Sequence, residues 1–172
     1  MKRIIAALLG VVMCLSLAAC TETDTPQKET NGGMATAPTQ VQEETFGLNE
    51  TAVFNDLKFT ATALEETSGK EYFKAEEGKV FVGVKFTIEN ISDEEQSVSS
   101  VLLFDGYADD VKCEYSISAS MAFEGTLDGS IAPGKKLVGY YSLEVPKEWK
   151  KLELDVKASW LSSTSARFVF EK

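Results

Sequence analysis

Hydrophobic and polar residues alternate along much of the chain after residue 45. In residues 79–90, apolar side chains occupy every second position from Val80 to Ile88. This period is typical of a strand that buries one face. Similar patterns predict further strands over residues 57–64, 96–104, 111–118, 137–145, 152–160 and 167–170. Short helices are expected only at residues 70–77 and 118–124.

Turn-forming residues separate these predicted strands. Ala132-Pro133-Gly134-Lys135 fits a type II turn, with proline at its second position and glycine at its third. Every aromatic residue of the chain lies in residues 46–172, which therefore form the expected folded domain. Seven or more strands joined by short connections predict an all-β fold, a two-sheet antiparallel sandwich.

The domain also resembles a known group. The resemblance is carried by four runs, FVGVKFTIEN at 81–90, LFDGY at 103–107, IAPGK at 131–135 and GYYSLEVP at 139–146. Their order resembles uncharacterised immunoglobulin-like domains that many bacterial lipoproteins carry, a group similar in fold to a mycobacterial secreted immunogenic protein. The resemblance implies an immunoglobulin-like sandwich and supplies no catalytic residues. The paired cysteines of antibody domains are missing, so it implies no disulfide between the sheets.

Residues 1–19 have the layout of a secretory signal peptide. Lys2 and Arg3 precede an uncharged, mostly apolar stretch that ends in small residues. The run LAAC at 17–20 resembles the lipobox of bacterial lipoproteins, which implies cleavage between Ala19 and Cys20 and a diacylglyceryl group on the Cys20 thiol. Two acyl chains are enough for stable membrane attachment. We therefore expect a protein anchored to the cell membrane and facing outward.

Two alternatives for this segment stay open. Residues 4–20 could remain as an uncleaved anchor, although they are at the short limit for spanning a bilayer and no basic flank follows. Ordinary cleavage could instead leave Cys20 as a free thiol. Beyond Cys20, residues 20–45 are rich in threonine and lack aromatic residues, which predicts a disordered linker.

Composition narrows the classes of function. The formal charge is −10, and it becomes −12 once Lys2 and Arg3 are removed with the signal, leaving Arg167 as the only arginine. This disfavours nucleic-acid binding. The absence of histidine excludes Ser-His-Asp and Cys-His catalysis, and we predict neither an enzyme nor a cofactor. Acylation of Cys20 would leave Cys113 without a disulfide partner, and its strand pattern predicts a buried thiol.

Two groups of residues are candidates for binding. Asp105, Asp109 and Asp110 could hold Ca²⁺, but their spacing is unlike an EF-hand. An Asp105-Gly106 turn with solvated acids explains the same residues and is favoured, so no metal site is predicted. Tyr140 lies on the polar face of its strand and Trp149 in a polar turn, so both are candidates for an exposed binding surface. The alternative for Trp149, which we favour, is a side chain tucked under the end of the sandwich.

These observations favour a non-enzymatic envelope module that binds a protein or a glycan. The alternatives are a small-ligand or envelope-hydrolase inhibitor role and, third, an enzyme. The fold class alone does not choose between them.

Overall fold

The computed structural model describes residues 27–28, 44–70 and 72–172. Almost all of the regular structure in these residues is strand, with two helices of four residues each. The strands are β1 (Gln27–Lys28), β2 (Thr45–Phe46), β3 (Thr51–Val53), β4 (Leu57–Thr67), β5 (Gly69–Lys70), β6 (Phe73–Lys74), β7 (Lys79–Asn90), β8 (Gln96–Val98), β9 (Phe104–Ala108), β10 (Val111–Cys113), β11 (Gly129–Ile131), β12 (Lys136–Pro146), β13 (Lys151–Lys157) and β14 (Ser165–Glu171). The helices are α1 (Ser100–Leu103) and α2 (Ile117–Ser120).

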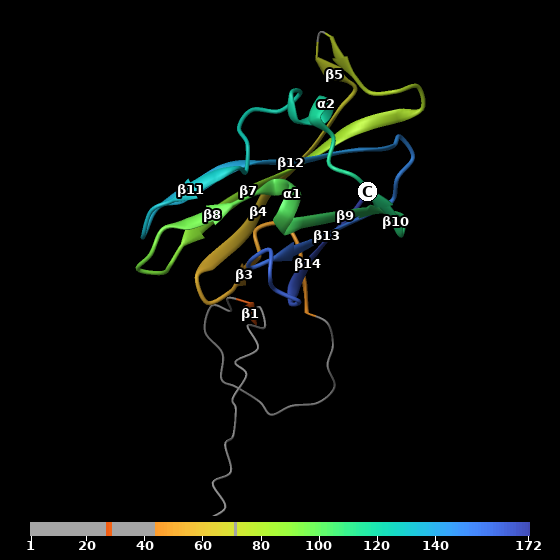
Figure 1. The fold of residues 1–172 in the computed structure, drawn as a ribbon. Helices are drawn as coiled ribbons and strands as arrows, with labels where there is room; N and C mark the ends of the chain where they lie inside the picture. Colours follow the sequence, from red (N-terminus) through yellow and green to blue (C-terminus); the bar gives the residue numbers. More distant parts are fainter. Residues whose placement is uncertain (1–26, 29–43, 71) are drawn as a thin grey trace, which may run out of the picture.

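The strands form two main sheets that pack face to face (Figure 1). Sheet 1 has the order β1-β3-β4-β7-β12, and sheet 2 has the order β10-β9-β13-β14-β2. All neighbours within them are antiparallel except β14 and β2, which are parallel. The predicted all-β, two-sheet sandwich is therefore confirmed.

Aromatic rings from both sheets meet in the core. Phe86 of sheet 1 lies 5.2 Å from Phe104 and 5.2 Å from Phe168 of sheet 2, measured between ring centroids. Phe59 of β4 contacts Phe104 edge to face at 6.1 Å. Burying each such side chain contributes about 1.5–3 kcal/mol. Residues 79–90 form β7 as predicted, with their alternating apolar side chains in this core.

Of two turns expected from the sequence, the structure contains one. Gly134 has φ 67° and the Lys135 N–H donates to the Ala132 carbonyl at 3.0 Å, as expected of the Pro-Gly turn. The predicted Asp105-Gly106 turn is wrong, because both residues lie inside β9. The chain turns instead at Asp109 and Asp110, whose φ values of 49° and 66° form a two-residue hairpin loop between β9 and β10.

Three other expected elements differ from the structure. The described residues of the stretch 70–77 are not helical, because Gly69 adopts φ 109° and starts the tight β5–β6 hairpin. The strand expected over residues 96–104 ends at Val98, and α1 follows, where the Ser100 N–H and hydroxyl both bind Asp128. The helix expected over 118–124 is a single turn, α2.

Part of the expected linker is also ordered. Gln27 and Lys28 pair with β3 as β1, and Thr45 belongs to β2, so the prediction of disorder throughout residues 20–45 is wrong at these positions. The edge of a sheet offers unpaired backbone groups, and a polar segment can bind them without burying apolar side chains. The predicted signal peptide, which ends at Ala19, and the predicted lipidation site Cys20 lie outside the described residues.

Candidate functional site

Residues 114–127 wrap around the free edge of β12. Tyr115 forms a bridge with Leu143 of β12, and Thr126 forms another with Tyr140. Between these bridges, α2 and Phe123 pack on the outer face of sheet 1. The Phe123 ring stacks on Tyr140 at 5.1 Å and lies so close to Gly83 that a Cβ there would sit 2.9 Å from it. This segment therefore adds a small second layer to one side of the sandwich.

A groove opens beside this segment, between α1 and the chain after β10. Its volume is about 350 Å³. It is lined by Val101, Phe104, Asp105, Lys112, Cys113, Glu114, Tyr115, Ile117 and Tyr141. Val101 and Ile117 are 63% and 69% exposed, so large apolar side chains face solvent here. We call this feature the Tyr115 groove.

A second depression adjoins the first, because Tyr115 lines both. It measures about 370 Å³ and is lined by Tyr115, Ser120, Met121, Phe123, Gly125 and Thr126. Met121 is exposed as well. The side of the molecule around α2 thus presents apolar side chains in two neighbouring hollows.

Two charged groups of the Tyr115 groove, Asp105 and Lys112, form an ion pair. Asp105 binds Lys112 at 2.8 Å and Lys157 at 2.9 Å. The hydrogen bonds from Lys112 and then Lys157 keep the pKa of Asp105 below its ordinary value. The Asp105 carboxylate is therefore ionised, and the two lysines balance its charge. Such a group is suited to binding a ligand rather than to proton transfer.

Cys113 lines the same groove and packs against the core, but it is half-buried, so the thiol is less buried than predicted. The reason is that β10 is the edge strand of sheet 2 and ends at Cys113. Sheet 1 therefore covers only one side of this residue. Burial still raises the pKa of the thiol, and its Sγ lies 3.4 Å from the Val111 carbonyl. A protonated thiol is a poor nucleophile.

Tyr140 is only 8% exposed and Trp149 only 3% exposed, so the prediction of an exposed binding surface on these two residues is wrong. The Tyr140 hydroxyl donates to Glu65 at 2.5 Å, and this hydrogen bond, with burial, raises the pKa of Tyr140 to about 12. Its ring is covered by Phe123, which sequence spacing did not reveal.

Trp149 is tucked under the end of the sandwich, as the favoured alternative predicted. Its indole N–H donates to Glu66 at 3.0 Å, and the Lys172 ammonium lies 5.3 Å from the ring centroid. Lys172 also binds Glu66 at 2.6 Å, and this bond lowers the pKa of Glu66. The cluster ties the C-terminus to β4 and has a structural role.

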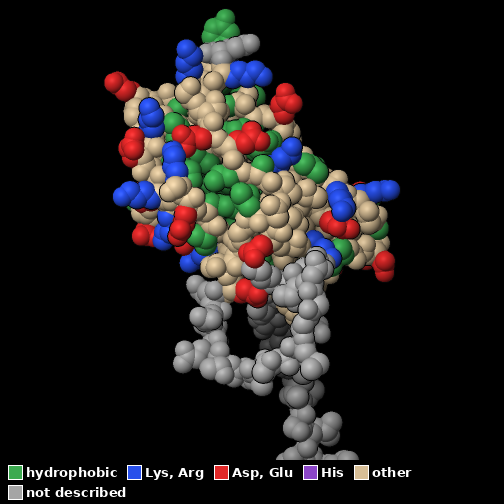
Figure 2. All heavy atoms as spheres, turned by 180° about the vertical axis from the view of Figure 1, so that it is seen from behind, with side chains coloured by type: hydrophobic (Ala, Val, Ile, Leu, Met, Phe, Trp, Pro, Cys, Tyr) green, Lys and Arg blue, Asp and Glu red, His purple; other side chains and the backbone are tan. Residues whose placement is uncertain are grey.

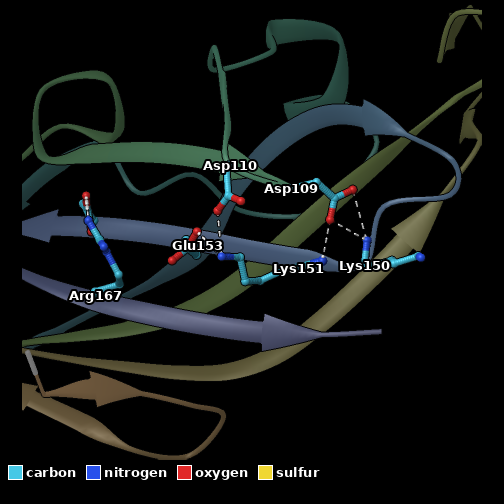
Figure 3. A network of polar contacts seen from close by, with 7 residues as sticks. Asp109, Asp110, Lys150, Lys151, Glu153 and Arg167 are labelled. Carbon is cyan, nitrogen blue, oxygen red and sulfur yellow. Dashed lines mark hydrogen bonds and ion pairs between the residues drawn. The ribbon is translucent and has the colours of Figure 1, made fainter.

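The acidic residues after β9 bind the start of β13 (Figure 3). The Asp109 carboxylate accepts hydrogen bonds from the backbone N–H groups of Lys150 and Lys151 at 3.0 Å and 2.9 Å. Asp110 pairs with the Lys151 ammonium at 2.7 Å, and Glu153 lies 3.1 Å from the same group. Among the described residues, no group of acidic or cysteine side chains has the arrangement of a metal site. These carboxylates hold two hairpins together.

Charges of both signs are interspersed over the face seen in Figure 2, around a central cluster of hydrophobic side chains. That face therefore shows no extended field of one sign, despite the negative net charge of the chain. In the part of the chain that is described, neither helix is long or apolar enough to cross a membrane.

Two packed antiparallel sheets, with an open apolar groove on one side, define a small β-sandwich domain. A family model described as a domain of unknown function, DUF4352, matches residues 46–167. The chain belongs to the DUF4352 family.

A bacterial relative is similar to the chain in sequence. The uncharacterised protein YxkC of Bacillus subtilis is 30% identical over 118 residues, which cover 62% of this chain and 66% of YxkC. The chain thus spans slightly less than two thirds of that relative.

Solved structures share the fold at low sequence identity. The proposed lipoprotein YcdA of Bacillus subtilis is 18% identical with a TM-score of 0.57, over 68% of this chain but only 37% of YcdA. An uncharacterised β-sandwich protein of Clostridium difficile is 17% identical with a TM-score of 0.51, over 78% of this chain and 99% of that one. YjhA of Bacillus subtilis is 18% identical with a TM-score of 0.56, over 73% and 97% of the two chains. These similarities establish the sandwich, while the immunoglobulin-like label stays a prediction.

Proposed function

We propose that this protein is a lipid-anchored envelope protein whose sandwich is a non-enzymatic binding module for a protein partner. The observation that carries the binding role is the Tyr115 groove, where Val101 and Ile117 expose apolar surface beside a hollow of about 350 Å³. Burial of a partner's apolar side chains contributes most binding free energy in a concave apolar site of this kind.

The lipid anchor is proposed from the lipobox-like run at 17–20. The same run implies a position on the outer side of the membrane. A structural neighbour, YcdA, is itself a proposed lipoprotein, which supports this part of the proposal. The groove favours a protein over a glycan, because the side chains that it exposes most, Val101 and Ile117, are aliphatic, and the candidate rings Tyr140 and Trp149 are buried.

Intact mass of protein extracted from membranes tests the anchor. We expect the wild type to lack residues 1–19 and to carry a diacylglyceryl group on Cys20, and the Cys20→Ser variant to carry none. An unmodified Cys20 in membrane-extracted wild type would rule the anchor out.

A photo-crosslinking residue placed at Ile117 tests the groove in living cells. The matched control carries the same residue at Ile91, which is also an exposed isoleucine but lies outside the groove. We expect a discrete protein adduct from position 117 only, and loss of that adduct when Val101→Asp is added. Equal adducts from both positions, or an adduct that Val101→Asp leaves unchanged, would contradict a binding role for the groove.

A further inference from the structure

The connection between β13 and β14 presents two exposed apolar side chains at its tip. The Ser162 N–H donates to the Ser159 carbonyl at 3.1 Å, which closes a turn with Trp160 and Leu161 at its central positions. The Ser162 hydroxyl and the backbone of Thr164 hold the returning chain. Trp160 is 68% exposed and Leu161 75% exposed. We call residues 159–162 the apolar turn.

The stretch of chain that contains the apolar turn carries no charge. Residues 158–166 contain no acidic or basic side chain, in a chain with 26% charged residues. The nearest charges along the chain are held by acids, since Lys157 binds Asp105 and Arg167 binds Asp155. A tryptophan and an aliphatic side chain set among serine and threonine residues suit the boundary between lipid headgroups and acyl chains, where indole rings concentrate.

The apolar turn lies where the N-terminal segment reaches the sandwich. Thr45 of β2 pairs in parallel with Arg167 of β14, so the chain before Thr45 and the connection before Arg167 come from the same end of sheet 2. At sheet 1, Gln27 pairs with Val53 of β3. Figure 1 shows β1, β3 and the β13–β14 connection on one lower side of the molecule.

We propose that the apolar turn inserts Trp160 and Leu161 into the outer surface of the lipid bilayer that holds the anchor, an inference that rests on the proposed lipid at Cys20. The tether brings the bilayer to this end of the molecule, and the turn offers it an uncharged apolar tip. The connection after β7 also lies at this end and carries exposed acids at residues 93–95. Because these acids are repelled by anionic headgroups, contact is confined to the corner of sheet 2 and favours neutral lipid.

Tryptophan fluorescence of the full-length lipidated protein in phosphatidylcholine vesicles tests this contact. The protein has two tryptophans, and Trp149 is buried at the opposite end, so only Trp160 can meet the lipid. We expect vesicles with brominated acyl chains to quench the emission of the wild type, compared with unbrominated vesicles. The Trp160→Phe variant, which keeps only Trp149, should show no such loss.

A matched control moves the exposed tryptophan to the far end. Tyr72 is 94% exposed on the β5–β6 hairpin, which Figure 1 shows on the side opposite β1. The double variant Trp160→Phe, Tyr72→Trp should float with the vesicles and remain unquenched. If the wild type floats with the vesicles but is not quenched, or if this control is quenched equally, the membrane contact is wrong and the anchor stands. If the wild type does not float, the anchor itself fails and the contact fails with it.

Discussion

Asn90 should be among the most sensitive polar positions of the domain. It ends β7 and is fully buried. Its amide nitrogen donates to the carbonyls of Glu94 and Ile131, both at 2.7 Å. Its amide oxygen accepts from the Ser92 N–H at 2.9 Å and from the Ser92 hydroxyl at 2.8 Å. One side chain thus joins the connection after β7 to β11.

The Asn90→Ala variant removes all four hydrogen bonds. At about 1 kcal/mol each, the upper limit of the loss is about 4 kcal/mol. Glu94 and Ser92 lie near solvent and can bind water instead, whereas the Ile131 carbonyl belongs to a buried residue and loses its partner. We therefore expect a loss of about 2–4 kcal/mol in the free energy of unfolding.

Equilibrium unfolding in urea measures this loss as a lower midpoint with an unchanged slope. The Asn90→Asp variant is the sharper test, because it keeps the acceptor and points a carboxylate at two carbonyl oxygens. That carboxyl would have its pKa raised in the folded state, so Asn90→Asp should be least stable at neutral pH and should recover as the pH falls. A loss below about 1 kcal/mol for Asn90→Ala, or no pH dependence for Asn90→Asp, would refute the reasoning.

Three further outcomes follow from the structure. Ser142→Ala should raise the free energy of unfolding by up to about 1 kcal/mol, because the buried Ser142 hydroxyl has no hydrogen-bond partner among the described residues; a lower urea midpoint would contradict this. Asp105→Asn should cost about 1 kcal/mol at pH 7, because Lys112 and Lys157 lose their ion pairs. Since the pKa of Asp105 is lowered in the folded state, that stabilisation is present above the ordinary value of 3.8 and is lost as the pH falls through the folded value, so melting curves of both proteins should converge in acid. Maleimide should label Cys113 more slowly in the native protein than in urea, because burial raises the pKa of the thiol; equal rates would show that the groove leaves it open.

The central strands could be predicted because their side chains alternate between a buried face and a solvent-exposed face. β7 was predicted at its observed bounds, and β12 extends the predicted strand by one residue at each end. The hairpin at residues 69–74 was missed, because its lysine and glutamate residues suit a helix, whereas the structure closes it with a hydrogen bond from the Ala75 N–H to the Ser68 carbonyl. The choice between helix and hairpin is decided here by the backbone conformation of Gly69, which the hydrophobic pattern does not reveal.

The Tyr115 groove was missed for a different reason. A strand over residues 111–118 puts Ile117 on the same face as Cys113, but β10 ends at Cys113 and Ile117 begins α2, where it is exposed. The path of residues 114–127 around β12 depends on contacts with residues far along the chain, such as Gly83 and Leu143. One usable signal was present, because Ile117 and Met121 are four residues apart and lie on one face of a helical turn.

β1 changes what a lipid on Cys20 would do. A free linker of residues 21–44 would let the sandwich drift away from the bilayer, but pairing of Gln27 with Val53 leaves seven residue steps between the anchor and sheet 1. Those steps span at most about 24 Å, which is less than the size of the domain. The domain would therefore keep the end with the apolar turn toward the lipid. The Tyr115 groove lies along the β10 side of the sandwich rather than under that end, so it would stay open to a partner that approaches across the membrane surface.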